Sequence, residues 1–300
     1  MGRTRAQIVA ELTAQGLRFR TFTLDEVSPH SIRDWDWNQR DLPHIPFVHG
    51  GFRFVRGVVE DDHAGGVFLQ RVLGVPLPMV VMFQHPERSR GERVYQASLG
   101  PLTVIIESVL AEAGAGTALT THYSIGGLPV AGLLLPLAER LLRRNAALLR
   151  REDEPLLARR SRLREWGYRF EGDADDASYL RSLDLRADRV IAPSVPARGE
   201  HVTLCADVDE VLLGRDDHQG LRARVDRTRR VLEVFPRMCS HEGASLDGCA
   251  VREGAIACPW HGRRVGPVAS FDLRPDGCRT SVVAGCTVSF DGTNLTRAPI

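Results

Sequence analysis

Four residues in the last quarter of the chain have the side chains and spacing that a metal–sulfur centre needs. Cys239 and His241 form a C-x-H pair. Cys258 and His261 form a C-x-x-H pair, and the sixteen residues 242–257 separate the pairs. Two thiolates on one iron and two neutral imidazoles on the other can hold a [2Fe–2S] cluster. The alternative is a structural Cys₂His₂ zinc site, but zinc fingers usually begin with a C-x₂₋₄-C spacing that is not found here.

The segments CSHEGASLDG and CPWHG resemble the two cluster-binding loops of the Rieske family. The resemblance covers about residues 190–300. The high-potential respiratory branch of that family has an extra loop cysteine three residues after the first histidine and a serine after the second His-Gly. This chain has Ala244 and Arg263 at these positions. Because fewer hydrogen bonds to the cluster sulfurs lower its potential, the resemblance points to the ferredoxin and oxygenase branch.

Composition sets broad limits on the function. Three hundred residues predict two domains, and 43% hydrophobic with 26% charged residues is ordinary for a globular protein. A net charge of +1 gives no general attraction to nucleic acid or to an anionic membrane. The N-terminal residues lack the apolar stretch of a signal peptide. The longest apolar run, 125–138, is too short to span a bilayer and holds two prolines, so we expect a cytoplasmic protein without a membrane span.

The remaining cysteines do not form an obvious disulfide framework. Two of the six cysteines are assigned to the cluster. We expect the other four to be buried, reduced thiols: Cys205, Cys249, Cys278 and Cys286.

The pattern of helices and strands predicts an α+β fold with two domains. Residues 4–15 form an amphipathic helix, 17–24 alternate as a strand does, and Ser28-Pro29 is typical of a helix start. Strand-like runs follow from 52 to 124, and a helical pattern covers about 133–166. We expect an antiparallel sheet curved around this long helix, with a cavity between them.

The domain boundaries follow from these changes of pattern. Residues 1–171 form the first domain. Residues 172–199 are acidic and then proline-containing, so we interpret them as a linker. Short strands return in 200–300, which predicts a small β-domain that carries the cluster loops.

A second set of candidate metal ligands lies in the first domain. Asn38-x₂-Asp41-x₂-His44-x₄-His49 places two imidazoles near a short, proline-disturbed helix, with Asp41 one turn before His44. Two histidines and one carboxylate make the facial triad of non-haem Fe(II) oxygenases. Asp153 is the candidate carboxylate, because it shares a helical face with leucines and a metal would neutralise its charge there.

Ordinary structural roles are the alternative for these residues. The histidines could belong to turns or helix ends, and Asp153 could pair with Arg150 or Arg160 at a solvated edge. Trp35 and Trp37 are expected to be core or helix-packing residues, and Phe47 either closes a pocket or packs.

Two segments resemble the Rieske non-haem iron oxygenases. NQRDLPHIPFVHG is similar to their iron-binding helix and REDEPLLARR to the late helix that supplies an aspartate. The strand-rich middle resembles their helix-grip (START-like) catalytic domain. The resemblance implies that His44, His49 and Asp153 bind the iron and that Asp41 bridges to a cluster histidine. It also implies a homotrimer in which electrons cross between subunits. The domain order here is the reverse of that usual in the family.

The leading hypothesis is therefore an oxygenase of an apolar small molecule. A separate ferredoxin or NAD(P)H-dependent reductase would supply electrons, since no G-x-G-x-x-G motif follows a strand. Binding without chemistry is the alternative, with the Rieske domain as an electron carrier or redox sensor, and a purely structural role is a third. The candidate lining residues of the substrate cavity are Val80, Val81, Val104, Ile105, Ile106, Leu133 and Leu134, and plain core is the favoured alternative for the same residues.

Overall fold

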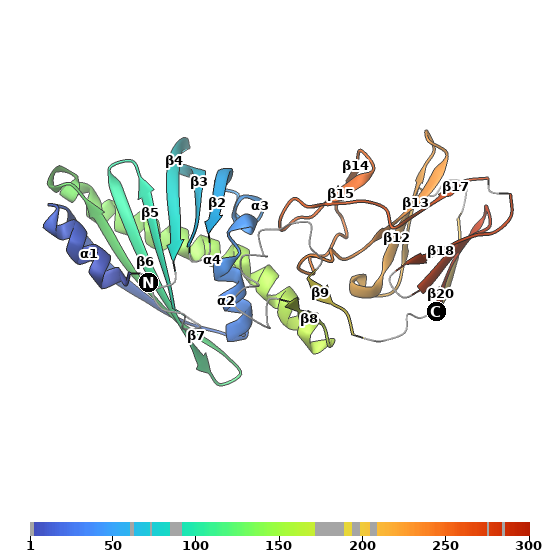
Figure 1. Ribbon diagram of the computed structural model, residues 1–300, viewed down its shortest axis with the longest axis horizontal. Coiled ribbons are helices and arrows are strands. Elements are labelled where there is room, and N and C mark those ends of the chain that lie inside the picture. The colour runs from blue at the N-terminus through green and yellow to red at the C-terminus, as the bar shows by residue number, and fades with distance from the viewer. Residues whose placement is uncertain are drawn as a thin grey trace. The chain divides into compact units, whose positions relative to one another are not determined.

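The computed structural model contains two compact units (Figure 1). It describes residues 3–60, 63–72, 74–84, 92–171, 189–193, 199–204, 209–274, 276–283 and 286–300. Of these residues, unit 1 comprises those up to Arg162, and unit 2 comprises Leu163–Glu171 and those from 189 onward.

Unit 1 is one antiparallel sheet with a long helix against it. The seven strands are ordered β1-β7-β6-β5-β4-β3-β2, so β1 and β2 are the edge strands and β1 pairs with β7. The α4 helix is 31 residues long, and its last three residues belong to unit 2. This is the helix-grip arrangement. The elements are α1 (Arg5–Ala14), β1 (Arg18–Ser28), α2 (Ile32–Arg40), η1 (Leu42–His44), α3 (Ile45–Val48), β2 (Phe52–Glu60), β3 (His63–Val72), β4 (Val75–Gln84), β5 (Glu92–Leu99), β6 (Leu102–Ala113), β7 (Gly116–Gly127), η2 (Pro129–Leu134) and α4 (Leu135–Glu165).

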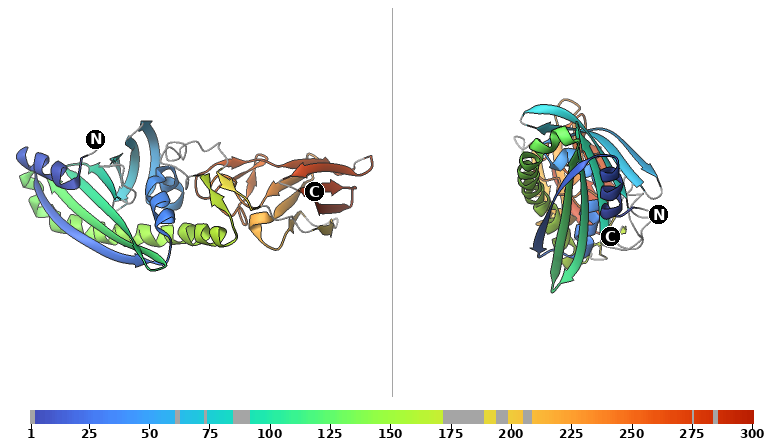
Figure 2. Two further views of the ribbon diagram at one scale, coloured as in Figure 1. Left: turned by 60° about the horizontal axis from the view of Figure 1, so that its bottom comes forward. Right: turned by 90° about the vertical axis from the view of Figure 1, so that its left-hand side faces the viewer.

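The two faces of this sheet carry different helices. On one face, Ile105 packs with Val94 and with Ile8 of α1. On the other face, Tyr123 and Ile125 pack with Leu135 at the start of α4. Successive side chains of a strand point to opposite faces, so each strand supplies both layers. Figure 2 shows the curved sheet in side view with α1 and α4 on opposite sides.

The structure corrects the expected cavity lining. Val104 and Ile106 belong to the same apolar cluster as Leu135 of α4. Val81 belongs to a second cluster that includes Leu149 of α4. Ile105 faces α1 instead, and Val80 is 45% exposed. The expectation was wrong for Leu133 and Leu134, because η2 turns both leucines outward.

Two helix starts also differ from the sequence-based expectation. Ser28 ends β1 rather than beginning a helix, and α2 begins at Ile32. The side chain of Ser31 caps α2 by accepting a hydrogen bond from the backbone N–H of Asp34. The long helix starts at Leu135, since residues 129–134 form the 3₁₀ turn η2.

Unit 2 is a small β-domain. Two four-stranded sheets, β10-β20-β19-β18 and β11-β12-β13-β17, share one apolar core, and β14-β15-β16 form a third sheet. Its elements are β8 (Arg169–Phe170), β9 (Val190–Ile191), β10 (Glu200–Thr203), β11 (Glu210–Leu213), η4 (Asp217–Gln219), β12 (Leu221–Asp226), β13 (Val231–Pro236), β14 (Val251–Arg252), β15 (Ala255–Ala257), β16 (Arg264–Val265), β17 (Ala269–Asp272), β18 (Arg279–Val283), β19 (Cys286–Phe290) and β20 (Asn294–Pro299).

Most of the expected linker, 172–199, lies outside the described residues, but β9 falls within it and pairs with β8. Cys205 also lies outside them. Cys286 is buried and Cys249 half-buried, both as free thiols, whereas Cys278 is exposed, which corrects the expectation for that residue. In the part of the chain that the structure describes, no helix is long and apolar enough to cross a membrane.

Candidate metal centres

The two cysteine–histidine segments of unit 2 form loops with the same backbone closure. In the first loop, the Cys239 N–H donates to the Ala244 carbonyl and the Gly243 N–H donates to the Cys239 carbonyl. In the second loop, Cys258 N–H donates to the Arg263 carbonyl and Gly262 N–H to the Cys258 carbonyl. Both glycines have a positive φ, 85° and 64°, which a residue with a side chain rarely adopts. A glycine four residues after each cysteine is therefore part of the loop design.

The two loops bring their four candidate ligands together. Cys239, His241, Cys258 and His261 are all at most 2% exposed. The Nδ1 atoms of the two histidines lie 3.3 Å apart. A hydrogen bond with the Cys258 thiol lowers the pKa of Cys239 to about 7 against the effect of burial, and the same contact with burial raises the pKa of Cys258.

Prolines shape the chain that carries the histidines of unit 1. The residue before a proline avoids the α conformation, so α2 ends before Pro43, and a one-turn 3₁₀ helix follows. Pro46 lies in the first turn of α3, where its missing N–H costs nothing. The chain therefore turns twice within ten residues, and His44 and His49 face the same point.

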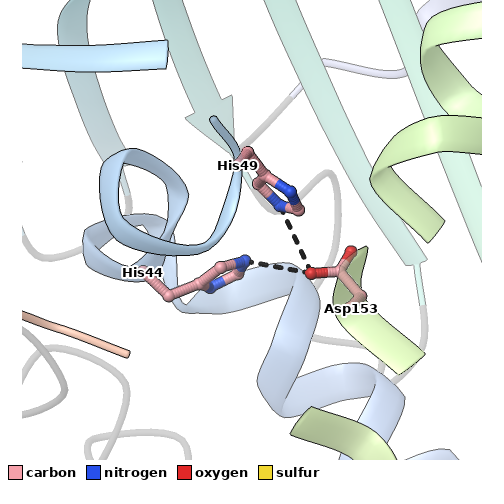
Figure 3. Close-up of side chains that lie close together, drawn as sticks. All are labelled: His44, His49 and Asp153. Atoms are coloured by element: carbon pink, nitrogen blue, oxygen red, sulfur yellow. Dashed lines mark ion pairs between the residues drawn. The ribbon is translucent and has the colours of Figure 1, made fainter. Parts of the chain in front are cut away.

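Asp153 of α4 completes this group. His44, His49 and Asp153 are buried, and they offer ligand atoms that all lie within 4.8 Å of one another. The Nε2 atoms of both histidines are 3.3 Å from the same Asp153 oxygen, Oδ1 (Figure 3). The residues that sequence reasoning selected, one hundred residues apart in the chain, are thus brought together.

A second carboxylate lies behind each histidine. The Nδ1 atom of His49 is 2.8 Å from Oε2 of Glu152, and the Nδ1 atom of His44 is 3.5 Å from Oδ2 of Asp41. The hydrogen bond to Glu152 fixes which ring nitrogen of His49 faces a metal, and Asp41 places a negative charge next to His44. Asp41 was expected near His44, but Glu152 was missed. The sequence feature that could have indicated Glu152 is its position next to Asp153, in a run of three acidic residues on a helix with many arginines.

The charges of the group balance one another. Burial disfavours the charged form of His44, but Asp153 and Asp41 more than offset this and raise the pKa of His44 to about 10. Burial likewise opposes ionisation of Asp153, but His44 and His49 lower its pKa well below the usual range. A buried imidazolium therefore stands between two carboxylates when no metal is bound.

The expected arginine partners of Asp153 bind elsewhere. Arg150 forms an ion pair with Glu26, and Arg160 pairs with the buried Asp34 at 3.3 Å. The Arg160 guanidinium also lies 4.0 Å over the ring of Trp37, which confirms a packing role for that tryptophan. Trp35 is core, next to Leu157. Phe47 is 52% exposed, so it is not a core residue.

A family model matches unit 2. The model of the Rieske [2Fe-2S] domain matches residues 194–276, a range that contains both loops. This chain carries a Rieske domain. The zinc-site alternative is therefore set aside. No curated protein matches the chain.

Several solved structures are similar to less than half of this chain. Ara h 8.0201 is 11% identical, with 47% of this chain and 99% of that chain covered and a TM-score of 0.41. A START superfamily protein from Mycobacterium smegmatis is 14% identical, with 46% and 98% covered and a TM-score of 0.38. Truncated norcoclaurine synthase from Thalictrum flavum is 13% identical, with 41% and 84% covered and a TM-score of 0.33. These values are too low to carry any conclusion, and the helix-grip description rests on the sheet order and on α4.

The residues present fit the metals that the Rieske domain and the triad imply. In the Rieske loops, two thiols and two imidazole Nδ1 atoms are buried together, as a [2Fe–2S] cluster requires. In unit 1, Nε2 of His44 and Oδ1 of Asp153 are buried without a hydrogen bond of normal geometry, although they are only 3.3 Å apart. A bound cation would satisfy both atoms.

Proposed function

We propose that this chain is a Rieske-type non-haem iron oxygenase whose helix-grip unit holds a mononuclear ferrous ion. The observation that carries the proposal is the buried convergence of two Nε2 atoms on one Asp153 oxygen. Two histidines and one carboxylate suit Fe(II) and leave coordination positions open. With both metals bound, the cluster supplies single electrons and the ferrous ion supplies O₂ activation, for hydroxylation or a related oxidation.

The side chains around the triad would hold its imidazoles in the binding tautomer. Glu152 accepts the Nδ1 proton of His49, and Asp41 lies next to Nδ1 of His44, so both Nε2 lone pairs point to the metal position. Fixed in this way, the ligands need little rearrangement when the metal binds. Burial of all three ligands keeps bulk water away from the site.

Asp41 would have a second role in electron supply. Its Oδ2 atom lies 3.5 Å from Nδ1 of His44, a candidate iron ligand, which suits a residue that links His44 to a cluster histidine. By resemblance, that histidine belongs to a neighbouring subunit of a trimer. A separate ferredoxin or NAD(P)H-dependent reductase would reduce the cluster, and the chain would act in the cytoplasm.

The substrate would be an apolar small molecule. Val81, Val104 and Ile106 face α4 and make that side of the sheet apolar. Apolar side chains there offer a substrate dispersion contacts and no hydrogen bonds, so recognition would depend on shape.

Iron content per chain tests the proposal. Protein purified anaerobically and fully loaded should contain about three irons and show a Rieske-type EPR signal after reduction, because the cluster holds two irons and the triad one. Asp153→Ala should contain about two irons with the same signal and no O₂-dependent turnover. Glu154→Ala is the matched control, since Glu154 is adjacent on α4 but contacts His30. A parent protein with only two irons after Fe(II) addition, or an active Asp153→Ala variant, would rule the proposal out.

One observation favours a second candidate function. The high pKa of His44 means that the triad can balance its own charges without a metal. In that case the chain is an electron carrier or redox sensor whose helix-grip unit binds an apolar ligand. Two irons per chain with a normal Rieske signal would favour this function.

A further inference from the structure

The segment that joins β7 to α4 is apolar and faces outward. Residues 128–137 read LPVAGLLLPL and contain no polar side chain. Leu133 is 91% exposed and Val130 is 82% exposed. Three more leucines are over half exposed: Leu128, Leu134 and Leu137. We call residues 128–137 the apolar tip.

The apolar tip is held in place by two buried residues. Ala131 and Leu135 are 5% and 6% exposed, and they fix one side of the segment to the unit. The other apolar side chains of the segment are more than half exposed: Leu128, Val130, Leu133, Leu134 and Leu137. Folded proteins rarely expose a contiguous apolar patch of this kind unless it binds something.

The apolar tip is not part of the candidate iron site. Asp153 lies eighteen residues after Leu135 on the same helix, which corresponds to about 27 Å at 1.5 Å per residue. Figure 2 shows η2 and the start of α4 at the end of unit 1 where α1 lies, with α2 and α3 at the other end. A separate role is therefore needed to explain the exposure.

Arginines follow the apolar tip along α4. Residues 128–151 contain five arginines and one acid, Glu139. Arg20 and Arg143 both donate hydrogen bonds to Glu139, so its charge is already compensated. Arg140 and Arg144 remain exposed on the surface of α4.

Arg140 and Arg144 lie at fixed distances from Leu137 along the axis of α4. Arg140 and Arg144 follow Leu137 by three and seven residues, so all three lie on one helical face. Along the axis, they are about 4.5 and 10 Å from Leu137. Apolar groups of peripheral proteins enter a bilayer by roughly 5–10 Å, with basic residues at the headgroups.

We propose that the apolar tip inserts into an anionic lipid bilayer, with Arg140 and Arg144 at the phosphate headgroups. The attachment is peripheral, by one short segment. It requires neither iron centre and is independent of the proposed oxygenase activity.

A second copy of the chain fits this surface less well. In a two-fold dimer through the apolar tip, the exposed arginines of one copy would approach the same arginines of the other. Stable interfaces also use about 20–30 residues on each side, more than a ten-residue segment supplies. Anionic lipid offers opposite charge and needs no large complementary surface.

The test is co-sedimentation of the cluster-loaded full-length protein with vesicles. The parent should bind vesicles of phosphatidylcholine with about 30% phosphatidylglycerol, and binding should fall as salt increases. The double variant Leu133→Asp and Leu134→Asp should bind at least ~10-fold more weakly. Val27→Asp changes an apolar residue that is 72% exposed on β1, outside the apolar tip, and should bind as the parent does.

A second pair of variants tests the charges. Arg140→Gln with Arg144→Gln should lose about 25-fold in affinity for anionic vesicles, from roughly fivefold per arginine. Arg252→Gln with Arg264→Gln removes the same charge from exposed positions in unit 2 and should have little effect. Thermal unfolding and the visible cluster spectrum report whether each variant is folded.

Three results would overturn the proposal. The first is a parent that does not bind anionic vesicles, and the second is unchanged binding by the folded aspartate variant. The third is a parent oligomer that the aspartate variant converts to monomer while neither protein binds vesicles, which would identify the apolar tip as a subunit contact.

Discussion

The Rieske loops and the triad of unit 1 place candidate metal ligands in two different ways. The Rieske ligands lie within 23 residues of chain, Cys239 to His261, and each loop is closed by its own backbone hydrogen bonds. The triad combines the α2–α3 segment with α4, and the His49–Glu152 contact joins residues 103 apart in sequence. The first centre depends on local backbone geometry, and the second depends on how a helix packs against a sheet.

The two centres also differ in how they balance charge. The Rieske ligands are thiols and imidazoles, with no carboxylate among them. The triad has carboxylates on both sides of its histidines, which keep His44 protonated at neutral pH. A metal therefore competes with a proton at the triad. Burial alone therefore does not make a metal site, because a buried ligand such as His44 must also release its proton when the metal binds.

Removing a Rieske thiol should separate the two centres most clearly. Cys258→Ser should lose about two irons per chain and the visible cluster absorption, because a hydroxyl replaces a thiolate ligand. Mononuclear iron should remain, since the triad is built in another unit. Iron analysis and EPR measure both quantities, with Cys278→Ser, an exposed cysteine of the same unit, as control. Loss of all iron would break the comparison by showing that the centres depend on each other.

The pH dependence of metal binding should sharpen the difference in charge balance. Below a pKa of about 10, metal-free His44 carries a proton that the metal must displace. Affinity of the triad for Co(II), measured by chelator competition on protein with its cluster in place, should rise about tenfold per pH unit from pH 6.5 to 8.5. Asp153→Ala, which lacks a triad ligand, gives the background. A flat affinity over this range would show that His44 is neutral before the metal binds.

A smaller effect is expected from the carboxylate behind His49. Glu152→Gln replaces the charged acceptor 2.8 Å from Nδ1 with a neutral amide, so metal affinity should fall 10- to 100-fold. The Rieske EPR signal should not change. Glu154→Gln is the control, because Glu154 contacts His30. If both variants bind metal equally well, Glu152 is only a surface partner of His49, and the triad is held by packing alone.

Local sequence was sufficient for the Rieske loops because all of their geometry is local. The C-x-H and C-x-x-H spacings identify the ligands, although they do not reveal that Gly243 and Gly262 close both loops in the same way. The long helix and the antiparallel sheet followed from apolar periodicity, which is strong over such lengths.

The periodicity of a strand shows that successive side chains point to opposite faces of the sheet, but not which helix covers each face. Ile105 was therefore predicted to line a cavity, although it packs with Ile8 of α1. The exposure of Leu133 was missed for a related reason, since a sequence of leucines looks the same in a core and on a surface. Asp153 was predicted because a carboxylate on the apolar face of a helix needs a cation. The contact of Glu152 with His49 was not predicted, because it depends on how α4 is rotated about its axis.

The pairing of β1 with β7 has a consequence for biosynthesis. Strand β1 has no partner strand until residues 117–127 have been synthesised, and Asp153 follows soon after. A further 86 residues, from Asp153 to Cys239, must then be translated before the first cluster ligand exists. At 5–20 residues per second this takes about 4 to 17 s, and domains generally fold as they are made, N-terminal first. Translation would therefore give the triad time to assemble, and to bind the proposed metal, before cluster insertion can begin.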